Sequence, residues 1–296
     1  MLTIDVTKLS PAQLQNYMQY AIAPRPICFA STIDAEGQIN LSPFSFFNMF
    51  STNPPVCVFS PARRVRDNTT KHTLENLLEV PECVINIVNY EMVQQMSLSS
   101  TEYPRGVNEF EKAGFTMEAS TLVKPPRVLE APVQMECVVQ QVLPLGDQAG
   151  AGNLIIAEVK LMHIKEYILD ESGKIDQEKI DLVARLGGDW YCRVTKDNLF
   201  RVAKPLTTLG IGVDALPIDV RYSSTLTGND LGMLGNVEVL PSPEEIDLMH
   251  ADPAVKEVLD ATIGDPGTRT RELHELAREF LRQGRVFDAL KIVLLD

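Results

Sequence analysis

The hydrophobic residues in the first two thirds of the chain fall into short runs of the length and composition that strands have. These runs cover residues 27–31, 56–60, 83–88, 133–143 and 154–168. Turn-forming residues at 34–37 and 147–152 follow the pattern of hairpin connections. The last two runs are long enough to bend around the corner of a barrel. The pattern therefore predicts a mainly β, antiparallel fold.

Apolar residues at helical spacing interrupt the strands at 73–80, 91–99 and 176–184, which predicts helices packed outside the barrel. Beyond residue 194 the pattern changes. Residues 201–241 are rich in Gly, Pro and Thr and predict an irregular linker. A capping box at 242–245, an Asp-Pro pair at 252–253 and a helical hairpin around Gly284 then predict a helical appendage. The expected division is 1–200 for the barrel, 201–241 for the linker and 242–296 for the appendage.

Charge and composition narrow the class of protein. The 296 residues carry a net charge of −13, which argues against a nucleic-acid-binding surface. No apolar run approaches the roughly 18 residues of a membrane span, and the first residues lack a signal-peptide pattern, so we expect a cytoplasmic protein. The five cysteines are widely spread without a Cys-x-x-Cys pair and are expected to be reduced core residues. The histidines lack partners at metal spacing, so no metal site is expected.

One segment departs from the acidic background. Residues 60–72 contain three arginines and Lys71 against a single acidic residue, Asp67, and the segment ends where a helix is predicted to begin. The unpaired N–H groups and positive dipole end of a helix start favour a phosphate. The alternative is an ordinary solvated basic loop.

Residues 40–48 read Asn-Leu-Ser-Pro-Phe-Ser-Phe-Phe-Asn and combine aromatic rings, hydroxyls and a carboxamide on a segment that Pro43 interrupts. Extended backbone that is not fully paired presents N–H and C=O groups to a ligand, while phenylalanine rings supply apolar walls. The segment predicts a site for a flat ring system with polar edges. The alternative, core packing, applies to at least one of the three phenylalanines.

Several motifs occur in an order that resembles the flavin reductase-like family. They lie at 20–26, 31–32, 40–48, 54–60, 71–73, 84–87, 106–110, 124–128 and 184–191. The family fold is the FMN-binding split barrel, which implies an antiparallel barrel of Greek-key type with outer helices. The sequence at 71–73 is Lys-His-Thr, and in this family an Asp often stands where this chain has His72.

The resemblance implies FMN as cofactor and NAD(P)H as co-substrate. Lys71 and Thr73 would bind the phosphate, Ser31 and Thr32 the phosphoribityl end, and residues 45–48 the isoalloxazine edge. Arg185 would reach the flavin from its own barrel or from a partner subunit, whereas Arg25 is either a ligand or a structural residue. The full expected cofactor-binding set is Arg25, Ser31, Thr32, Ser45, Phe46, Phe47, Asn48, Ser60, Lys71, Thr73 and Arg185.

The function that the resemblance implies is electron transfer from NAD(P)H to flavin or another small acceptor by a homodimeric oxidoreductase. The flavin itself carries the redox chemistry, so no catalytic side chain is expected. No Gly-x-Gly-x-x-Gly or P-loop motif is present, so a nicotinamide cofactor would bind without a dinucleotide domain. Two alternatives remain: an FMN electron carrier of flavoredoxin type that a protein partner reduces, and a non-redox split-barrel binding protein.

Overall fold

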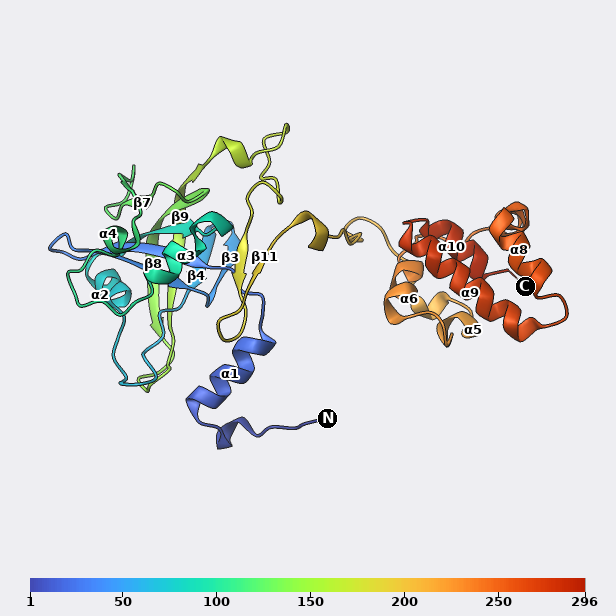
Figure 1. The fold of residues 1–296 in the computed structure, drawn as a ribbon, viewed down its shortest axis with the longest axis horizontal. Coiled ribbons are helices and arrows are strands. Elements are labelled where there is room, and N and C mark those ends of the chain that lie inside the picture. Colours follow the sequence, from blue (N-terminus) through green and yellow to red (C-terminus); the bar gives the residue numbers. More distant parts are fainter. Residues whose placement is uncertain (296) are drawn as a thin grey trace. The chain divides into compact units, whose positions relative to one another are not determined.

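The computed structural model describes residues 1–295, which form two compact units, the first over Met1–Phe200 and the second from Arg201 onward. The first unit contains the large sheet and the second is helical (Figure 1). Within residues 1–295, no helix has both the length and the apolar character that a membrane span requires.

The first unit is built on one antiparallel sheet of seven strands in the order β2-β1-β5-β8-β9-β4-β3. β2 and β3 are the two edges, although only Ser45 and Phe46 separate them in the chain. Three residue steps span at most about 11 Å, so the sheet must curl until its edges meet at this corner. The antiparallel barrel predicted from the sequence is confirmed. The strands are β1 Cys28–Ile33, β2 Ile39–Phe44, β3 Phe47–Thr52, β4 Pro55–Phe59, β5 Glu82–Ile87, β8 Val133–Pro144 and β9 Asn153–Ile164.

Residues 40–48 are more regular than expected. Pro43 lies inside β2 and pairs in register with Phe29 of β1, and only Ser45 and Phe46 lie outside the two strands. An edge strand accepts proline because one row of its N–H groups has no ladder partner. The long strands bend as expected, with register shifts in the β8–β9 pairing at Glu136/Cys137 and Val139/Gln141.

The barrel interior holds apolar side chains from every long strand, including four buried thiols. Cys83 and Cys137 face each other in register on β5 and β8, and Cys28 and Cys57 lie in the same core. All five cysteines are free; four are buried as expected, whereas the expectation of a core position is wrong for Cys192, which is half-buried. Burial raises the pKa of the Cys28 thiol well above its usual range, so this thiol remains protonated.

Helices cover the outside of the barrel. Leu74 and Leu77 of α2 enter the barrel core, whereas Met92 and Met96 form a second apolar cluster with Phe29 and other side chains. The helical segments are α1 Pro11–Ala21, α2 His72–Glu79, the 3₁₀ turn η2 Tyr90–Met92, α3 Val93–Leu98 and α4 Glu109–Ala113. Two short sheets, β6 Met117–Glu118 with β7 Arg127–Val128 and β10 Val183–Arg185 with β11 Tyr191–Arg193, complete the unit.

The helix predicted at 176–184 is wrong. The carboxylate of Asp176 accepts hydrogen bonds from the backbone N–H groups of Glu178 and Lys179, a local turn that competes with a helix. Asp181 then has a positive φ of 51°, and the chain enters β10. The strand expected over 154–168 ends at Ile164 and is followed by the 3₁₀ turn η3 Glu166–Ile168.

The second unit is a helical bundle with its own core. The two predicted helix starts are confirmed, since Ser242 and Glu245 form the capping box and Asp252 caps the next helix. Gly284, with a φ of +77°, separates the two helices of the predicted hairpin. The helical segments are α5 Ile218–Arg221, α6 Gly228–Gly235, α7 Pro243–Asp247, η6 Leu248–Ala251, α8 Pro253–Ala261, α9 Pro266–Arg282 and α10 Val286–Val293.

Residues 201–241 differ from the expected irregular linker. They contain α5 and α6, and the fully buried Val220 and Leu234 belong to the same core as α9 and α10. The glycines of α6 lower its intrinsic helix propensity, which conceals it in the sequence. A reciprocal cap between Thr227 and Asp230 starts the helix nevertheless. The helical unit therefore begins earlier than residue 242.

Candidate functional site

A cavity of about 850 Å³ opens beside the corner where the two edges of the barrel meet. Its walls come from this corner, from the loop after β4, from α1, from the end of α3 and from the β10–β11 hairpin. Ligand pockets in proteins have volumes of roughly 300–1,000 Å³, so this cavity is large enough for a cofactor.

The cavity wall is strongly basic in an otherwise acidic chain. Within residues 1–295, six cationic side chains line it, and Glu102 supplies the single carboxylate. The whole chain has a net charge of −13. Such a local concentration of positive charge attracts anionic ligands. The six cations are Arg25, Arg63, Arg64, Arg66, Lys71 and Arg185.

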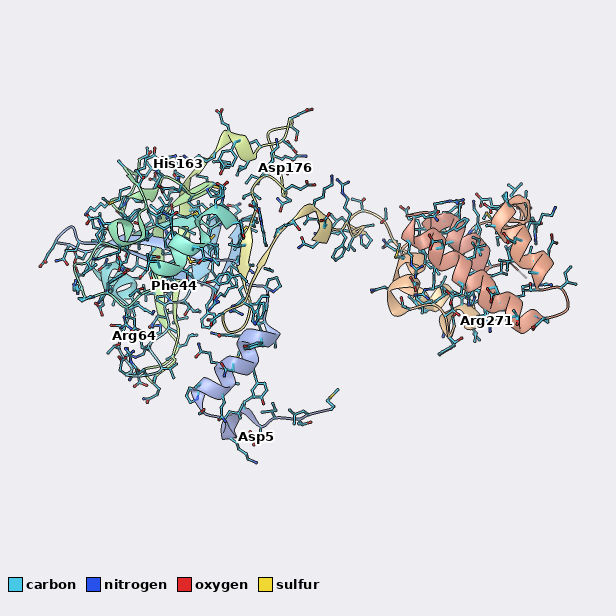
Figure 2. All side chains as sticks on the ribbon, in the orientation of Figure 1. Asp5, Phe44, Arg64, His163, Asp176 and Arg271 are labelled. Atoms are coloured by element: carbon cyan, nitrogen blue, oxygen red, sulfur yellow. The ribbon has the colours of Figure 1, made fainter. Side chains whose placement is uncertain are left out.

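Two of these arginines shape the loop after β4. Arg63 donates to the Asn68 side-chain oxygen at 2.7 Å and to its backbone oxygen at 2.6 Å. Arg64 donates to the Thr69 hydroxyl at 2.8 Å and to the backbone oxygen of Thr70. Asn68 has a positive φ of 57° and donates to the backbone oxygen of Asp147 in the β8–β9 hairpin. Figure 2 labels Arg64 at the lower left of the first unit.

Glu102 also lines the cavity and pairs with two arginines of this loop. Its carboxylate accepts from Arg64 Nε at 3.2 Å and from Arg66 Nη2 at 2.7 Å. The hydrogen bond from Arg66 is the main reason that the pKa of Glu102 lies below its usual value. Sequence reasoning missed Glu102, because a carboxylate beyond the basic segment carries no local signal.

Lys71 is the cation of the loop without a protein partner. Its ammonium makes no hydrogen bond or ion pair within residues 1–295, and no side chain caps α2, which starts at His72. Burial, and then the nearby Arg64, lower the pKa of Lys71, while Glu102 acts in the opposite direction. A phosphate at this position would meet both a cation and a helix start.

The structure does not bring Ser31, Thr32 or Thr73 to the wall of the large cavity. All three are fully buried, where α2 packs on β1 and β2. The Thr73 hydroxyl donates to Asn40 at 2.6 Å, and the Thr32 hydroxyl accepts from Asn76 at 3.2 Å. Thr73 lines only a small neighbouring pocket of about 20 Å³, which Lys71 and His72 also line.

The corner segment divides between cavity and core. Ser45 and Phe46 line the cavity, and the Phe46 carbonyl accepts from the backbone N–H of Ser60 at 2.9 Å. Ser60 also lines the cavity, and its hydroxyl oxygen accepts from the Asn153 backbone N–H at 3.0 Å. Phe47 is half-buried against the barrel core.

Asn48 and Phe44 lie on either side of that corner and differ in burial. Asn48 is exposed, and its side-chain oxygen accepts from the Met49 backbone N–H at 2.8 Å, so it does not line the cavity. Phe44, labelled in the first unit in Figure 2, packs on Phe59 with ring centroids 5.5 Å apart. Phe44 belongs to the barrel core and also lines the cavity, whereas Phe47 packs on the core and does not line it, so core packing alone accounts for Phe47.

Arg25 acts as a structural clamp on the cavity wall and is only 7% exposed. Its Nη1 donates to the backbone oxygens of Gln19 at 2.7 Å and Ile22 at 2.8 Å, at the end of α1. Nη2 donates to the Leu186 oxygen at 3.0 Å and Nε to the Ser45 hydroxyl at 3.3 Å. One residue thus ties α1, the corner and the β10–β11 hairpin together.

Arg185 lies next to Arg25 but keeps its guanidinium unpaired. The two backbones exchange hydrogen bonds of 2.9 Å. The Arg185 guanidinium lies over the Tyr191 ring, 4.6 Å from its centroid, and makes no hydrogen bond or ion pair within residues 1–295. A Cβ on Gly187 would lie 2.4 Å from the Tyr20 ring, which explains the glycine in this turn.

Sequence reasoning also missed α1 as a cavity wall. Leu14 and Met18 of α1 line the cavity, together with Ile22, the residue that directly follows the helix. The spacing of four residues places Leu14 and Met18 on one face of the helix, and this spacing was the signal available in the sequence.

Residues 20–175 match the family described as Flavin reductase like domain. The chain belongs to this family. The resemblance noted in the sequence is thereby confirmed, and the family match ends before the helical unit. A protein of Aquifex aeolicus is 41% identical over 172 residues, which are 58% of this chain and 85% of that protein.

Solved structures agree with this assignment. Nitrilotriacetate monooxygenase component B from Bacillus cereus superposes with a TM-score of 0.64 at 29% identity, covering 68% of this chain and 98% of that chain. The 2-nitrobenzoate 2-nitroreductase of Pseudomonas fluorescens superposes with a TM-score of 0.61 at 27% identity, covering 71% and 100%. These similarities support a flavin-related oxidoreductase with a split-barrel fold.

Proposed function

We propose that the chain binds FMN in the cavity and transfers electrons from NAD(P)H to a flavin or another small acceptor. The observation that carries the proposal is the basic cavity wall, with an unpaired Lys71 at the start of α2. FMN, when bound, supplies the redox chemistry. The chain's own residues supply binding, orientation and the exclusion of water.

Phosphate binding falls to Lys71 and the start of α2. A compact ammonium and unpaired backbone N–H groups both suit phosphate oxygens. Ser60 lines the same cavity, and because its oxygen accepts from Asn153, its O–H remains available as a donor to a ligand. Thr73 contributes indirectly, since its bond to Asn40 fixes the first turn of α2.

The isoalloxazine ring of the proposed FMN would lie against the wall at the corner between β2 and β3. Phe46 offers an aromatic surface and Ser45 a hydroxyl, while Ile27 and Met96 make the neighbouring wall apolar. An apolar wall excludes water and strengthens the electrostatic contacts that remain. No acid or base from the chain is required for the transfer, and the proposal assigns none.

We also propose that the chain forms a homodimer through the exposed edge of the barrel. β3 is an edge strand without a charged residue, and its Met49 and Phe50 are 63% and 70% exposed. Soluble proteins normally protect such an edge, and pairing with a second copy would do so. Sedimentation of the purified protein tests this, and a monomer at micromolar concentration would contradict it.

The central experiment compares FMN with riboflavin and then adds an electron donor. The purified protein should bind FMN with a visible flavin spectrum and should bind riboflavin more weakly, because riboflavin lacks the phosphate. Equal affinities would refute the phosphate site. Anaerobic mixing with NADH or NADPH should then bleach the bound flavin. A protein that stays yellow with both donors would be a carrier that a protein partner reduces.

A further inference from the structure

The cations of the cavity fall into paired and unpaired groups. Arg63 and Arg64 are held by loop oxygens, and Arg66 is paired with Glu102. The guanidinium of Arg25 already donates four hydrogen bonds to other residues of the chain. Among the cavity-lining residues, Lys71 and Arg185 remain without an acceptor. The sequence predicts that Arg185 reaches the flavin, but the phosphate of the proposed FMN is assigned to Lys71, which leaves the guanidinium of Arg185 available for a different anion.

The two unpaired cations have different neighbours. Lys71 lies near Arg64 and Glu102, the charges that act on its pKa. Arg185 lies beside Arg25. Burial is the main cause that lowers the pKa of Arg25, and the positive charge of Arg185 is the second cause. Within residues 1–295, Glu102 is the only carboxylate that lines the cavity, and it is engaged with the loop arginines. An anion from solution is therefore the partner that the Arg185 site lacks.

An apolar surface completes this part of the wall. Leu14 and Met18 of α1 and Ile22, which directly follows it, line the cavity, and Arg25 binds backbone oxygens at the end of that helix. The Tyr191 ring lies under the Arg185 guanidinium and also lines the cavity. A ligand here meets one forked cation and a surface of aliphatic and aromatic carbon.

We propose that Arg185, Tyr191 and the α1 stripe of Leu14, Met18 and Ile22 form a second subsite that binds a small aromatic carboxylate. The inference rests on the proposed function, because it assigns the phosphate part of the cavity to FMN. A guanidinium binds a carboxylate through two parallel hydrogen bonds, which a point cation does not reproduce. The aromatic ring of such a ligand buries its carbon surface against the α1 stripe.

The test uses the full chain loaded with FMN and three probes: benzoate, benzamide and acetate. Calorimetry and the shift of the bound flavin spectrum both report binding. Benzoate should bind more tightly than benzamide, which lacks the charge, and than acetate, which lacks the ring. In Arg185→Gln the benzoate Kd should rise by about ten- to a hundredfold, the range for loss of a charge-assisted contact. The FMN Kd should not change.

Arg193→Gln is the matched control, because Arg193 belongs to the same hairpin but pairs with Asp181 outside the cavity wall. It should leave the benzoate Kd unchanged. Met18→Gln should weaken benzoate and benzamide together and spare acetate. These two variants separate a loss of the cation from a loss of the apolar surface.

Several results would overturn the subsite. Equal affinities for benzoate and benzamide would remove the role of the charge, and equal affinities for benzoate and acetate would show only unspecific anion binding. A weaker FMN Kd in Arg185→Gln would assign Arg185 to the flavin. Displacement of benzoate by ADP-ribose, lost in the same variant, would assign the site to a dinucleotide. Failure to bind FMN at all would refute the proposed function alone, since calorimetry with benzoate still decides the subsite.

Discussion

Replacing Lys71 with Met removes the unpaired ammonium of the proposed phosphate site while keeping a long side chain. The lysine has no acceptor within residues 1–295, and both burial and Arg64 already oppose its charge. The substitution therefore should not destabilise the free protein. Its effect should appear only when a phosphate is present.

The expected magnitude follows from the one contact that is lost. A hydrogen bond to a charged group contributes about 1.5–3 kcal/mol, which corresponds to a rise in the FMN Kd of about 10- to 150-fold. Riboflavin has no phosphate, so its Kd should stay within about twofold, less than the roughly 1.4 kcal/mol of a tenfold change. Comparing FMN and riboflavin in the wild type and in Lys71→Met therefore isolates the contribution of the contact between Lys71 and the phosphate.

The assay is titration of each flavin by fluorescence quenching at two salt concentrations. Lys174→Ala is the control, because Lys174 is exposed and does not line the cavity. In the wild type, added salt should weaken FMN, and this dependence should be smaller in Lys71→Met. An unchanged FMN Kd, or an equal loss for FMN and riboflavin, would refute the reasoning.

Three further predictions concern other titratable groups. Glu102→Gln should lower the FMN Kd and leave riboflavin unchanged, because the negative charge of Glu102 acts on Lys71 and opposes a second anion beside it; weaker FMN binding would refute this. Cys192, the only half-buried cysteine, should be the one thiol that reacts rapidly with Ellman's reagent in the native protein, and rapid reaction of a second would contradict the buried core. Burial lowers the pKa of His274, while the nearby Asp219 acts to raise it. The Nδ1 atom of His274 lies 2.7 Å from the Ser223 hydroxyl oxygen. The unfolded chain then takes up the proton first, so the free energy of unfolding of the helical unit should fall below about pH 6.5 and stay level above it. Urea unfolding followed by circular dichroism checks this, with His274→Gln removing the slope; a slope that survives in the variant would contradict it.

The sequence predicted the barrel because its signals are local. Strand composition, hairpin turns and the capping box at Ser242 each depend on a few neighbouring residues, and each is found in the structure. The helices in 201–241 were not predicted, because α6 carries glycines and gains its stability from a core that α9 and α10 share. Such stabilisation is tertiary and leaves little local pattern.

The site was predicted less completely than the fold for a similar reason. A motif shows which residue types are present, but the side of an element on which a hydroxyl lies depends on packing. The Thr32 and Thr73 hydroxyls bond to Asn76 and Asn40 inside the protein, whereas Lys71, two residues before Thr73, faces the cavity. Chain position alone did not distinguish them.

The clamp at Arg25 explains why motifs so far apart in the chain act as one unit. Arg25 binds the end of α1, Ser45 at the corner and Leu186 in the hairpin turn, which lies 161 residues away. Its backbone also pairs with Arg185. These three walls of the cavity therefore share one buried guanidinium with four acceptors, and removing it would leave those acceptors unsatisfied. The arginine between two prolines contributes to the site by holding its walls in register, while Lys71 and Arg185 remain available for ligands.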